Sequence, residues 1–136
     1  MAFFTVGKAL DKSWTAPGGG LTWRFLLLKG IWVPDVAAAV VDDLVPATNE
    51  LSGGNYSRQA IAGQAISFAG GNARHTCSNP SWANLTAADV RYLVAFLDTG
   101  SDATAALHSY YDIGAQSISA ATFNPQIASG ILFLGT

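Results

Sequence analysis

The sequence predicts a mainly β protein, a β-sandwich or barrel-like single domain with only one or two helical turns. Three observations lead to this fold class. The apolar runs are short and numerous, and Gly, Asn and Pro residues separate them at turn-forming positions. The chain has 136 residues, of which 50% are hydrophobic, so a single domain of this length can bury a substantial core.

The first twenty residues are expected to stand apart from the domain that follows. Apolar side chains recur there at helical spacing, at Phe3, Val6, Ala9 and Leu10. This spacing predicts a short amphipathic helix or an arm over Phe3–Lys12, and the breakers APGGG at 16–20 end it. We therefore expect an N-terminal arm or short helix with a Gly-rich linker at 1–20, and a β-rich domain at 21–136.

The β-rich domain is expected to begin with the strand Leu21–Lys29 (LTWRFLLLK), which leads into a loop over Gly30–Asp35. Asp35 stands where the N-cap residue of a helix would lie. We therefore expect one or two helical turns over Val36–Leu44, which Pro46 stops.

Further short strands are expected at Tyr56–Ile61, Gln64–Phe68, around Trp82, Gln116–Phe123 and Ile131–Leu134. The turn signals that separate the elements are Ser52–Asn55, Gly70–Asn72 and Asn124-Pro125.

The clearest element is a hairpin over 91–114, RYLVAFLDTGSDATAALHSYYDIG. Its first arm is apolar on both faces. One row is Val90, Tyr92, Val94 and Phe96, and the other is Leu93, Ala95 and Leu97. A strand of a sandwich normally has one core face and one solvent face. The second face therefore needs a cover, which is either this domain's own helix or another chain.

The chain is poor in charge. Only 12% of its residues are charged, against about 25% in an ordinary soluble domain. Two explanations are open: an exterior of small polar residues, or an exterior that partner subunits cover. We expect partner subunits to cover at least part of it, so the chain is expected to form a homo-oligomer.

Several function classes are disfavoured by composition. The seven basic residues are scattered and the net charge is −2, so nucleic-acid binding is not expected. A single cysteine excludes an intrachain disulfide framework. The start lacks the regions of a signal peptide, and no run approaches the ~18 apolar residues of a membrane span. We expect a chain made in the cytosol, with no membrane partner, that stays there or leaves by a route other than secretion.

The triplet Asp98-Thr99-Gly100 resembles the motif of retroviral-type aspartic proteases, in which two chains each supply an aspartate and the close carboxylates share a proton. Ile131–Gly135 resembles the apolar element that supports that site. Against this reading, Phe96 is bulkier than the family prefers, and only 36 residues follow Gly100, too few for the intervening flap. Asp and Gly are also common turn residues, and we favour the turn over this remote alternative.

The sequence offers little for metal or nucleophilic chemistry. His75 and Cys77 lie two residues apart and His108 is distant. A Cys/His nucleophile pair is conceivable, but residues i and i+2 of any strand share a face. As zinc ligands they are too few, because zinc takes four protein ligands or three and a water. We favour a structural use and expect neither a metal nor a cofactor.

Four tryptophans and four tyrosines are a possible platform for a glycan or a set of anchors at a protein interface. Core packing explains most of them. Trp32, next to Pro34 in a predicted loop, is the one that we expect to be exposed.

The order of five segments resembles a group of small structural proteins of tailed-phage virions. The segments are RFLLLKGIWVPD, NELSGGNYSRQAIAGQAISF, SWANLTAADVRYLVAFLDTG, LHSYYDIGAQSIS and ASGILFLGT. Members show an apolar strand running into a Pro-Asp loop, a Ser-Gly-x-x-Tyr segment, a Tyr-rich strand ending in Asp-Thr-Gly and a short terminal strand. The likeness covers roughly 21–136, and the chain departs from it at Ala16–Gly20 and at Ala37–Ala39.

This resemblance implies a β-rich virion component of the head-decoration, cement or fibre-like kind, which leaves the host by lysis. We therefore expect a non-enzymatic capsid decoration protein that binds the major capsid protein and itself. The alternative is a tail or fibre component that binds a host glycan or a neighbouring tail protein. The contact elements that we expect are the N-terminal segment and the first loop, with Phe3, Phe4, Leu10, Ile31, Trp32, Val33 and Pro34.

Overall fold

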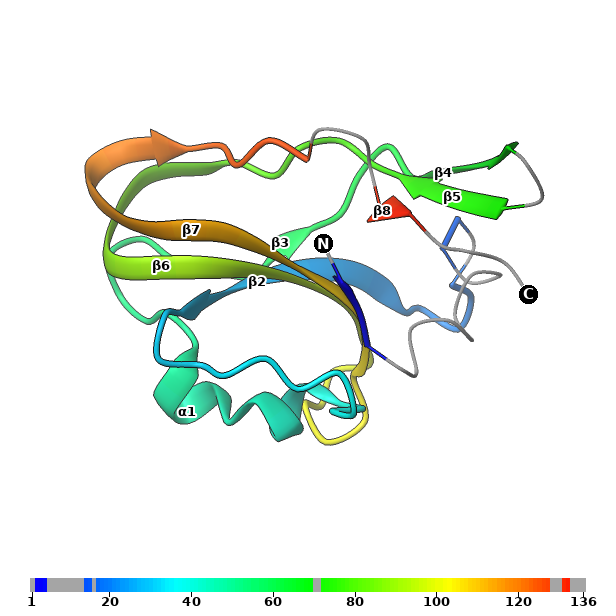
Figure 1. Ribbon diagram of the computed structural model, residues 1–136, viewed down its shortest axis with the longest axis horizontal. Helices are drawn as coiled ribbons and strands as arrows, with labels where there is room; N and C mark the ends of the chain where they lie inside the picture. The colour runs from blue at the N-terminus through cyan, green and yellow to red at the C-terminus, as the bar shows by residue number, and fades with distance from the viewer. Residues whose placement is uncertain (1, 5–13, 16, 70–71, 128–130, 133–136) are drawn as a thin grey trace.

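The computed structural model describes residues 2–4, 14–15, 17–69, 72–127 and 131–132, and these residues form two antiparallel sheets (Figure 1). The larger sheet has the strand order β1-β7-β6-β2-β3, with β1 (Ala2–Phe3), β7 (Ala106–Phe123), β6 (Trp82–Asp98), β2 (Thr22–Lys29) and β3 (Gln59–Ala60). The smaller sheet has the order β4-β5-β8, with β4 (Ala65–Ala69), β5 (Asn72–Thr76) and β8 (Ile131–Leu132). The predicted mainly β class is confirmed.

Strands β6 and β7, of 17 and 18 residues, form one long hairpin that bends over itself. The pairing register shifts repeatedly between Trp82 and Tyr92, and such bulges bend and twist a pair of strands. In Figure 1 the beginning of β6 and the end of β7 curl back above the rest of the sheet. The predicted strands around Trp82 and over Gln116–Phe123 are therefore present, but as parts of this hairpin rather than as separate elements.

A first apolar core lies inside this bend. Leu93 and Ala95 on one face of β6 pack there with Phe25 and Leu27 of β2. Val90 joins them instead of following the row of Tyr92, because the register shifts between these two residues. The upper layer of the bend and the N-terminal segment add further buried side chains, among them Trp14, Trp82, Leu85 and Phe123.

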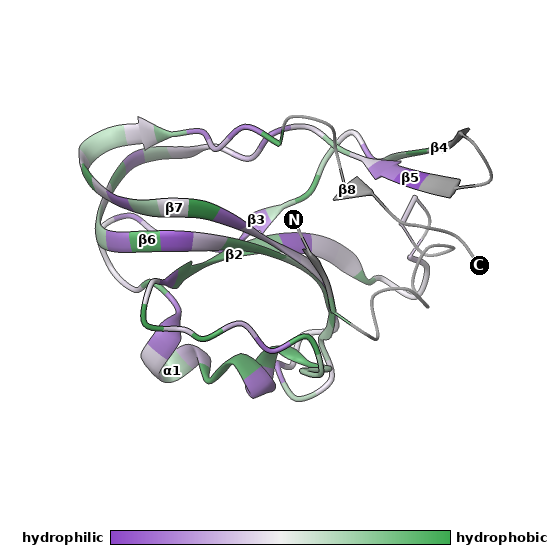
Figure 2. Cartoon of the chain, in the orientation of Figure 1, coloured by the Kyte–Doolittle hydropathy of each residue, from purple (hydrophilic) through white to green (hydrophobic). Residues whose placement is uncertain are grey.

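The opposite face of β6 is covered by the chain itself. Tyr92, Val94 and Phe96 on that face pack with Trp32 and Val41 in a second core. The last two belong to the connection of residues 30–45, which crosses below the sheet in Figure 1 and carries apolar stretches in Figure 2. An irregular connection therefore supplies most of the cover, so the apolar second face of β6 does not by itself require another chain.

The helical turns begin later than the sequence predicts. They are a 3-10 turn, η3 (Val41–Leu44), and a short helix, α1 (Pro46–Asn49). Pro46 begins α1 instead of stopping a helix, because the first turn of a helix does not need the N–H that proline lacks. Asp35 does not cap a helix: its Oδ1 accepts a hydrogen bond from the N–H of Ala37, two residues on, which is typical of a turn.

The start of the chain belongs to the larger sheet. Strand β1 pairs with β7, so the prediction of a helix that begins at Phe3 is wrong at its first residue. Most of Phe3–Lys12, including Leu10, lies outside the described residues. Phe4 and Trp14 are fully buried, one in each core. These two residues of the predicted arm therefore pack inside the β-rich domain.

Candidate functional site

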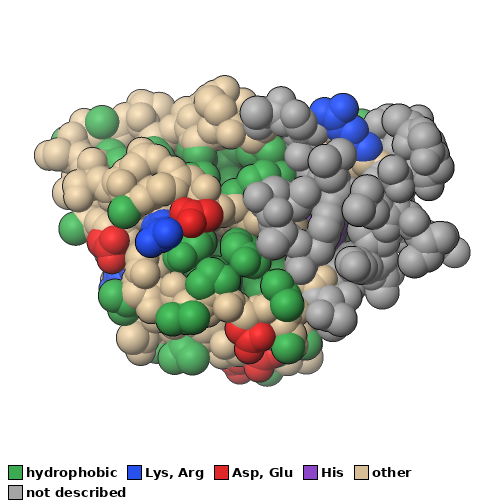
Figure 3. Space-filling view, viewed as in Figure 1, with side chains coloured by type: hydrophobic (Ala, Val, Ile, Leu, Met, Phe, Trp, Pro, Cys, Tyr) green, Lys and Arg blue, Asp and Glu red, His purple; other side chains and the backbone are tan. Residues whose placement is uncertain are grey.

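The 30–45 connection carries the large apolar side chains that face outward. Among the described residues the exposed large hydrophobics are Ile31 at 60%, Val33 at 79%, Val36 at 47% and Val45 at 53%. We call these four the 31–45 surface. Figure 3 shows apolar side chains gathered on the lower part of this face, where Figure 1 places the connection. Single exposed apolar residues are normal, but a local group marks a site of interaction.

Backbone hydrogen bonds hold this connection against the loop between β6 and β7 and against the start of β7. The N–H of Val41 donates to the carbonyl of Ala105 at 3.0 Å. In the other direction, the N–H of Leu107 donates to the carbonyl of Ala39 at 3.0 Å. The connection is thus fixed along the end of the hairpin, and its outward side chains have a defined position.

Trp32 anchors the connection to the larger sheet. The expectation that it is exposed is wrong, because only 5% of it is accessible. Its ring lies edge-on to Tyr92 at 4.9 Å and to Tyr110 at 5.3 Å between centroids, and such pairs stabilise beyond the area that they bury. With Trp32 turned inward, its neighbours Ile31 and Val33 face outward.

The seven predicted contact residues differ in their exposure in the structure. Three are exposed, namely Ile31, Val33 and Pro34. Trp32 and Phe4 are buried within the chain, so neither ring lies on the surface. The side chain of Phe3 and the whole of Leu10 lie outside the described residues. The sequence prediction did not include Val36 and Val45 among the contact residues. It placed them in or beside a helical turn, and tertiary packing decides which side of such a turn is buried.

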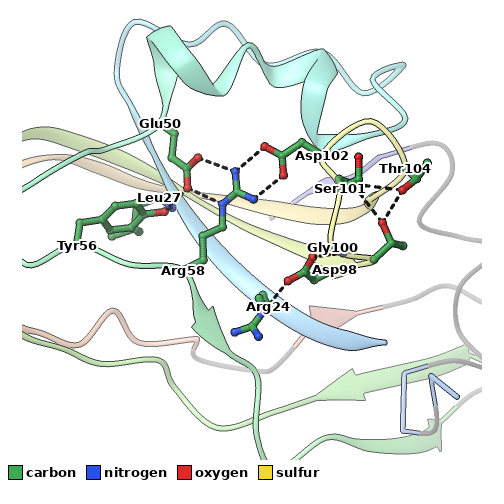
Figure 4. A network of polar contacts seen from close by, with 11 residues as sticks. Arg24, Leu27, Glu50, Tyr56, Arg58, Asp98, Gly100, Ser101, Asp102 and Thr104 are labelled. Atoms are coloured by element: carbon green, nitrogen blue, oxygen red, sulfur yellow. Dashed lines mark hydrogen bonds and ion pairs between the residues drawn. The ribbon is translucent and has the colours of Figure 1, made fainter. Parts of the chain in front are cut away.

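The guanidinium of Arg58 binds two carboxylates, those of Glu50 and Asp102 (Figure 4). Its Nε and Nη2 donate to Glu50, both at 2.8 Å, and its Nη1 and Nη2 donate to Asp102 at 2.6 and 3.0 Å. The guanidinium also lies 5.3 Å from the ring centroid of Phe96. Glu50 follows α1 and Asp102 lies in the loop after β6, so two bidentate pairs tie these segments together.

Hydrogen bonds and burial shift the pKa values of Arg58, Asp102 and Tyr56 in this network. The hydrogen bonds to Glu50, and then those to Asp102, raise the pKa of Arg58, and the hydrogen bonds from Arg58 lower the pKa of Asp102. Tyr56 donates to Glu50 at 2.6 Å and accepts from the N–H of Leu27 at 3.0 Å. Burial raises the pKa of Tyr56. These shifts favour a structural clamp over acid–base chemistry.

A second buried polar group joins the two sheets. His75 of β5 and His108 of β7 are fully buried, and Nδ1 of the first lies 3.0 Å from Nε2 of the second. Trp14 stacks on both rings, with centroid distances of 5.2 and 5.1 Å. Burial, followed by the neighbouring His75, lowers the pKa of His108 to about 3. The ring of His108 is therefore neutral at physiological pH and part of the core.

Cys77 does not have the properties of a nucleophile. Burial raises the pKa of its thiol to about 11, whereas a reactive cysteine needs a thiolate. Within the described ranges, no group of three or more His, Cys, Asp or Glu side chains could hold a metal ion. The described helices are too short and too polar to cross a membrane.

The triplet Asp98-Thr99-Gly100 lies at the turn of the long hairpin, as the turn interpretation predicts. Strand β6 ends at Asp98, whose Oδ1 accepts the N–H of Gly100 at 2.8 Å. Its Oδ2 is paired with Nε of Arg24 at 2.7 Å. Both oxygens of this carboxylate thus have partners within the same chain.

Comparisons with protein-family models, with curated proteins and with solved structures found no match. A function for this chain therefore depends on the geometry of the 31–45 surface and on the sequence resemblance to small virion proteins.

Proposed function

We propose that this chain is a non-enzymatic structural protein of a tailed-phage virion, which decorates the capsid and stabilises the head lattice by bridging capsid subunits. One observation carries the proposal: the exposed large apolar side chains of the described chain lie together in one connection, the 31–45 surface. That connection is anchored by Trp32 and held to the hairpin end, so the surface is ordered before a partner arrives.

The energetics suit a protein that binds an assembled lattice. Fully burying a side chain such as Ile31 or Val33 contributes roughly 1.5–3 kcal/mol relative to leaving it exposed. A ligand that binds only the assembled state stabilises it by about 2.7 kcal/mol per site when it is present at a hundredfold excess over Kd. Many weak sites on one shell then add to a large resistance against disassembly.

A tail component that binds a neighbouring tail protein is the second candidate, because the same apolar surface would serve it equally well. The glycan-binding version is weaker, since the ring expected to stack on a sugar, that of Trp32, is buried. Electron microscopy of virions with antibody against this chain separates head from tail.

The test of the surface is a binding measurement with purified capsids of the phage that encodes the chain. We expect the double variant Ile31→Ser/Val33→Ser to bind at least about tenfold more weakly, which corresponds to roughly 1.4 kcal/mol. The matched control is Ala115→Ser/Ala121→Ser, which makes two apolar-to-polar changes at exposed positions of β7. Equal binding by both double variants, or no binding by the wild type, would overturn the proposal.

A further inference from the structure

No ion pair in the described part of the chain involves a carboxylate of the 30–45 connection. Arg24 pairs with Asp98, Arg91 pairs with Asp112, and Arg58 pairs with two carboxylates. In the described part of the chain, three of the cations are thus neutralised locally by acids of the same chain.

The acids without a basic partner gather at the surface instead. Asp35, Asp42, Asp43 and Asp89 are exposed, and within the described ranges none of them forms a salt bridge. The first three lie in the connection itself, and Asp89 accepts the N–H of Gly30 at its start. Lys29, the cation nearest in sequence, turns its Nζ toward the carbonyl of Thr48 at 3.4 Å.

Backbone hydrogen bonds favour the charged form of the Asp43 carboxylate. Asp43 accepts hydrogen bonds from the N–H groups of Ala39 and Val40, at 2.8 and 3.1 Å, and they lower its pKa. Between residues 30 and 57 the sequence holds four acidic residues and no Lys, Arg or His. The 31–45 surface is therefore an apolar patch whose border carries more acidic than basic side chains.

A second copy of the chain fits this surface poorly. In a twofold interface both copies present the same patch, so the acidic borders of both chains would lie at the rim of one interface. Like charges brought together in this way disfavour the pairing, and they reject a partner that carries the same charge pattern.

From this charge pattern we infer that the occupant of the 31–45 surface is a different protein, whose contact area is apolar and bordered by Lys or Arg side chains. The inference rests on the proposed function and adds the chemistry of the partner. Charges at the rim of an interface act mainly on the association rate and on its salt dependence, which makes the inference measurable.

The experiment measures binding of the full chain to purified capsids of the encoding phage at low and at high NaCl concentration. The variant is Asp35→Asn/Asp42→Asn, because Asn keeps the oxygen that accepts the N–H of Ala37. The matched control is Ser117→Lys/Ser119→Lys, which makes the same change in net charge at exposed positions of β7. Light scattering gives the oligomeric state of the wild type and of Val33→Asp.

We expect wild-type binding to weaken with salt, and the Asn double variant to bind about threefold to tenfold more weakly at low salt. The Lys control should bind as the wild type does, and Val33→Asp should leave the oligomeric state unchanged. If capsid binding occurs but changes neither with salt nor in the Asn variant, the inference that the partner has a basic border is wrong. The proposed function is not affected by that result. A wild-type oligomer that Val33→Asp dissociates shows that the occupant is a second copy. Absence of any capsid binding overturns the proposed function itself.

Discussion

The imidazole of His75 joins the smaller sheet to the larger one through the imidazole of His108, with 3.0 Å between Nδ1 of the first and Nε2 of the second. One ring must donate and the other accept, so this contact needs at least one neutral ring. Trp14 stacks on both rings, and both are fully buried. Protonation of both rings would place two charges in the core.

We therefore expect the free energy of unfolding to fall on mild acidification. The unfolded chain takes up a proton at His108 near pH 6.5, whereas the folded chain resists this until about pH 3. Stability from this residue is complete above pH 6.5 and decreases as the pH falls toward 3, by up to about 1.4 kcal/mol per pH unit. Urea denaturation followed by tryptophan fluorescence at about pH 7, 6 and 5 measures the slope.

The matched variant for this prediction is His108→Gln, which keeps a hydrogen-bonding side chain but cannot take up a proton in this range. It should show a flatter dependence on pH, whatever its absolute stability. The lowered pKa values of Asp43, Asp102 and Asp112 act in the same direction only below their ordinary value of 3.8. An identical slope in wild type and variant above pH 5 would show that the pair does not carry the effect.

Much of the sheet could be predicted because its strands have strong local signals. The β2 strand contains the apolar run Phe25–Leu28, and the end of β6 has two apolar rows before the turn residues of Asp98-Thr99-Gly100. The ends of the long hairpin lacked such signals. The predicted hairpin spans only 91–114, whereas in the structure Asp89 and Gly114 adopt positive φ inside the longer bulged strands.

The site was only partly predictable, because burial in an irregular segment is decided by residues far away in the sequence. The outward direction of Ile31 and Val33 depends on Trp32 being held by Tyr92 and Tyr110, and no local pattern encodes that contact. Arg58 likewise meets its carboxylates across 8 and 44 residues. Sequence reasoning identified the connection and three of its exposed residues, but it wrongly placed Trp32 among them.

The Arg58 clamp should contribute far more to stability than a surface ion pair of the same chemistry. Arg58→Ala leaves Glu50 and Asp102 side by side, 11% and 32% exposed, without their shared cation. We expect a loss of about 2–3 kcal/mol in the free energy of unfolding. Chemical denaturation measures it.

The control for the clamp is Arg91→Ala, which removes a pair with Asp112 that is 40% and 45% exposed. Exposed ion pairs contribute little, so this variant should unfold close to the wild-type midpoint. Arg58→Lys should lose an intermediate amount of stability, because an ammonium group keeps the charge but cannot form bidentate hydrogen bonds to both carboxylates. Equal losses in Arg58→Ala and Arg91→Ala would show that the clamp does not stabilise the fold.

Two adjacent glycines in the turn before Tyr56 should respond differently to alanine. Both have positive φ, at 68° for Gly53 and 58° for Gly54, so alanine costs about 1 kcal/mol at either position from backbone strain alone. At Gly53 nothing lies within 4 Å of the added carbon, but at Gly54 it would overlap the carbonyl of Thr86. Thermal unfolding should therefore show a loss of roughly 3 kcal/mol for Gly54→Ala. A loss at Gly53 as large as that at Gly54 would contradict the close contact with β6.

Val45 carries two unfavourable features in one residue, which indicates a use beyond folding. Its φ is 52°, a conformation that valine rarely adopts, and 53% of it is exposed. Val45→Asn keeps the backbone conformation with a residue that tolerates it, so we expect the free energy of unfolding to rise by up to about 1 kcal/mol. The same variant should bind capsids more weakly, because it removes an apolar contact from the 31–45 surface.

The comparison variant for Val45 is Val36→Asn, which makes the same change in polarity at a position of similar exposure without a positive φ. It should weaken capsid binding too, but it should not gain stability, since no strain is relieved. Denaturation midpoints and capsid affinities for both variants therefore separate the two effects. If Val45→Asn were no more stable than Val36→Asn, the positive φ of Val45 would not cost stability. The reason for a valine at position 45 would then lie in the folded chain rather than in a partner.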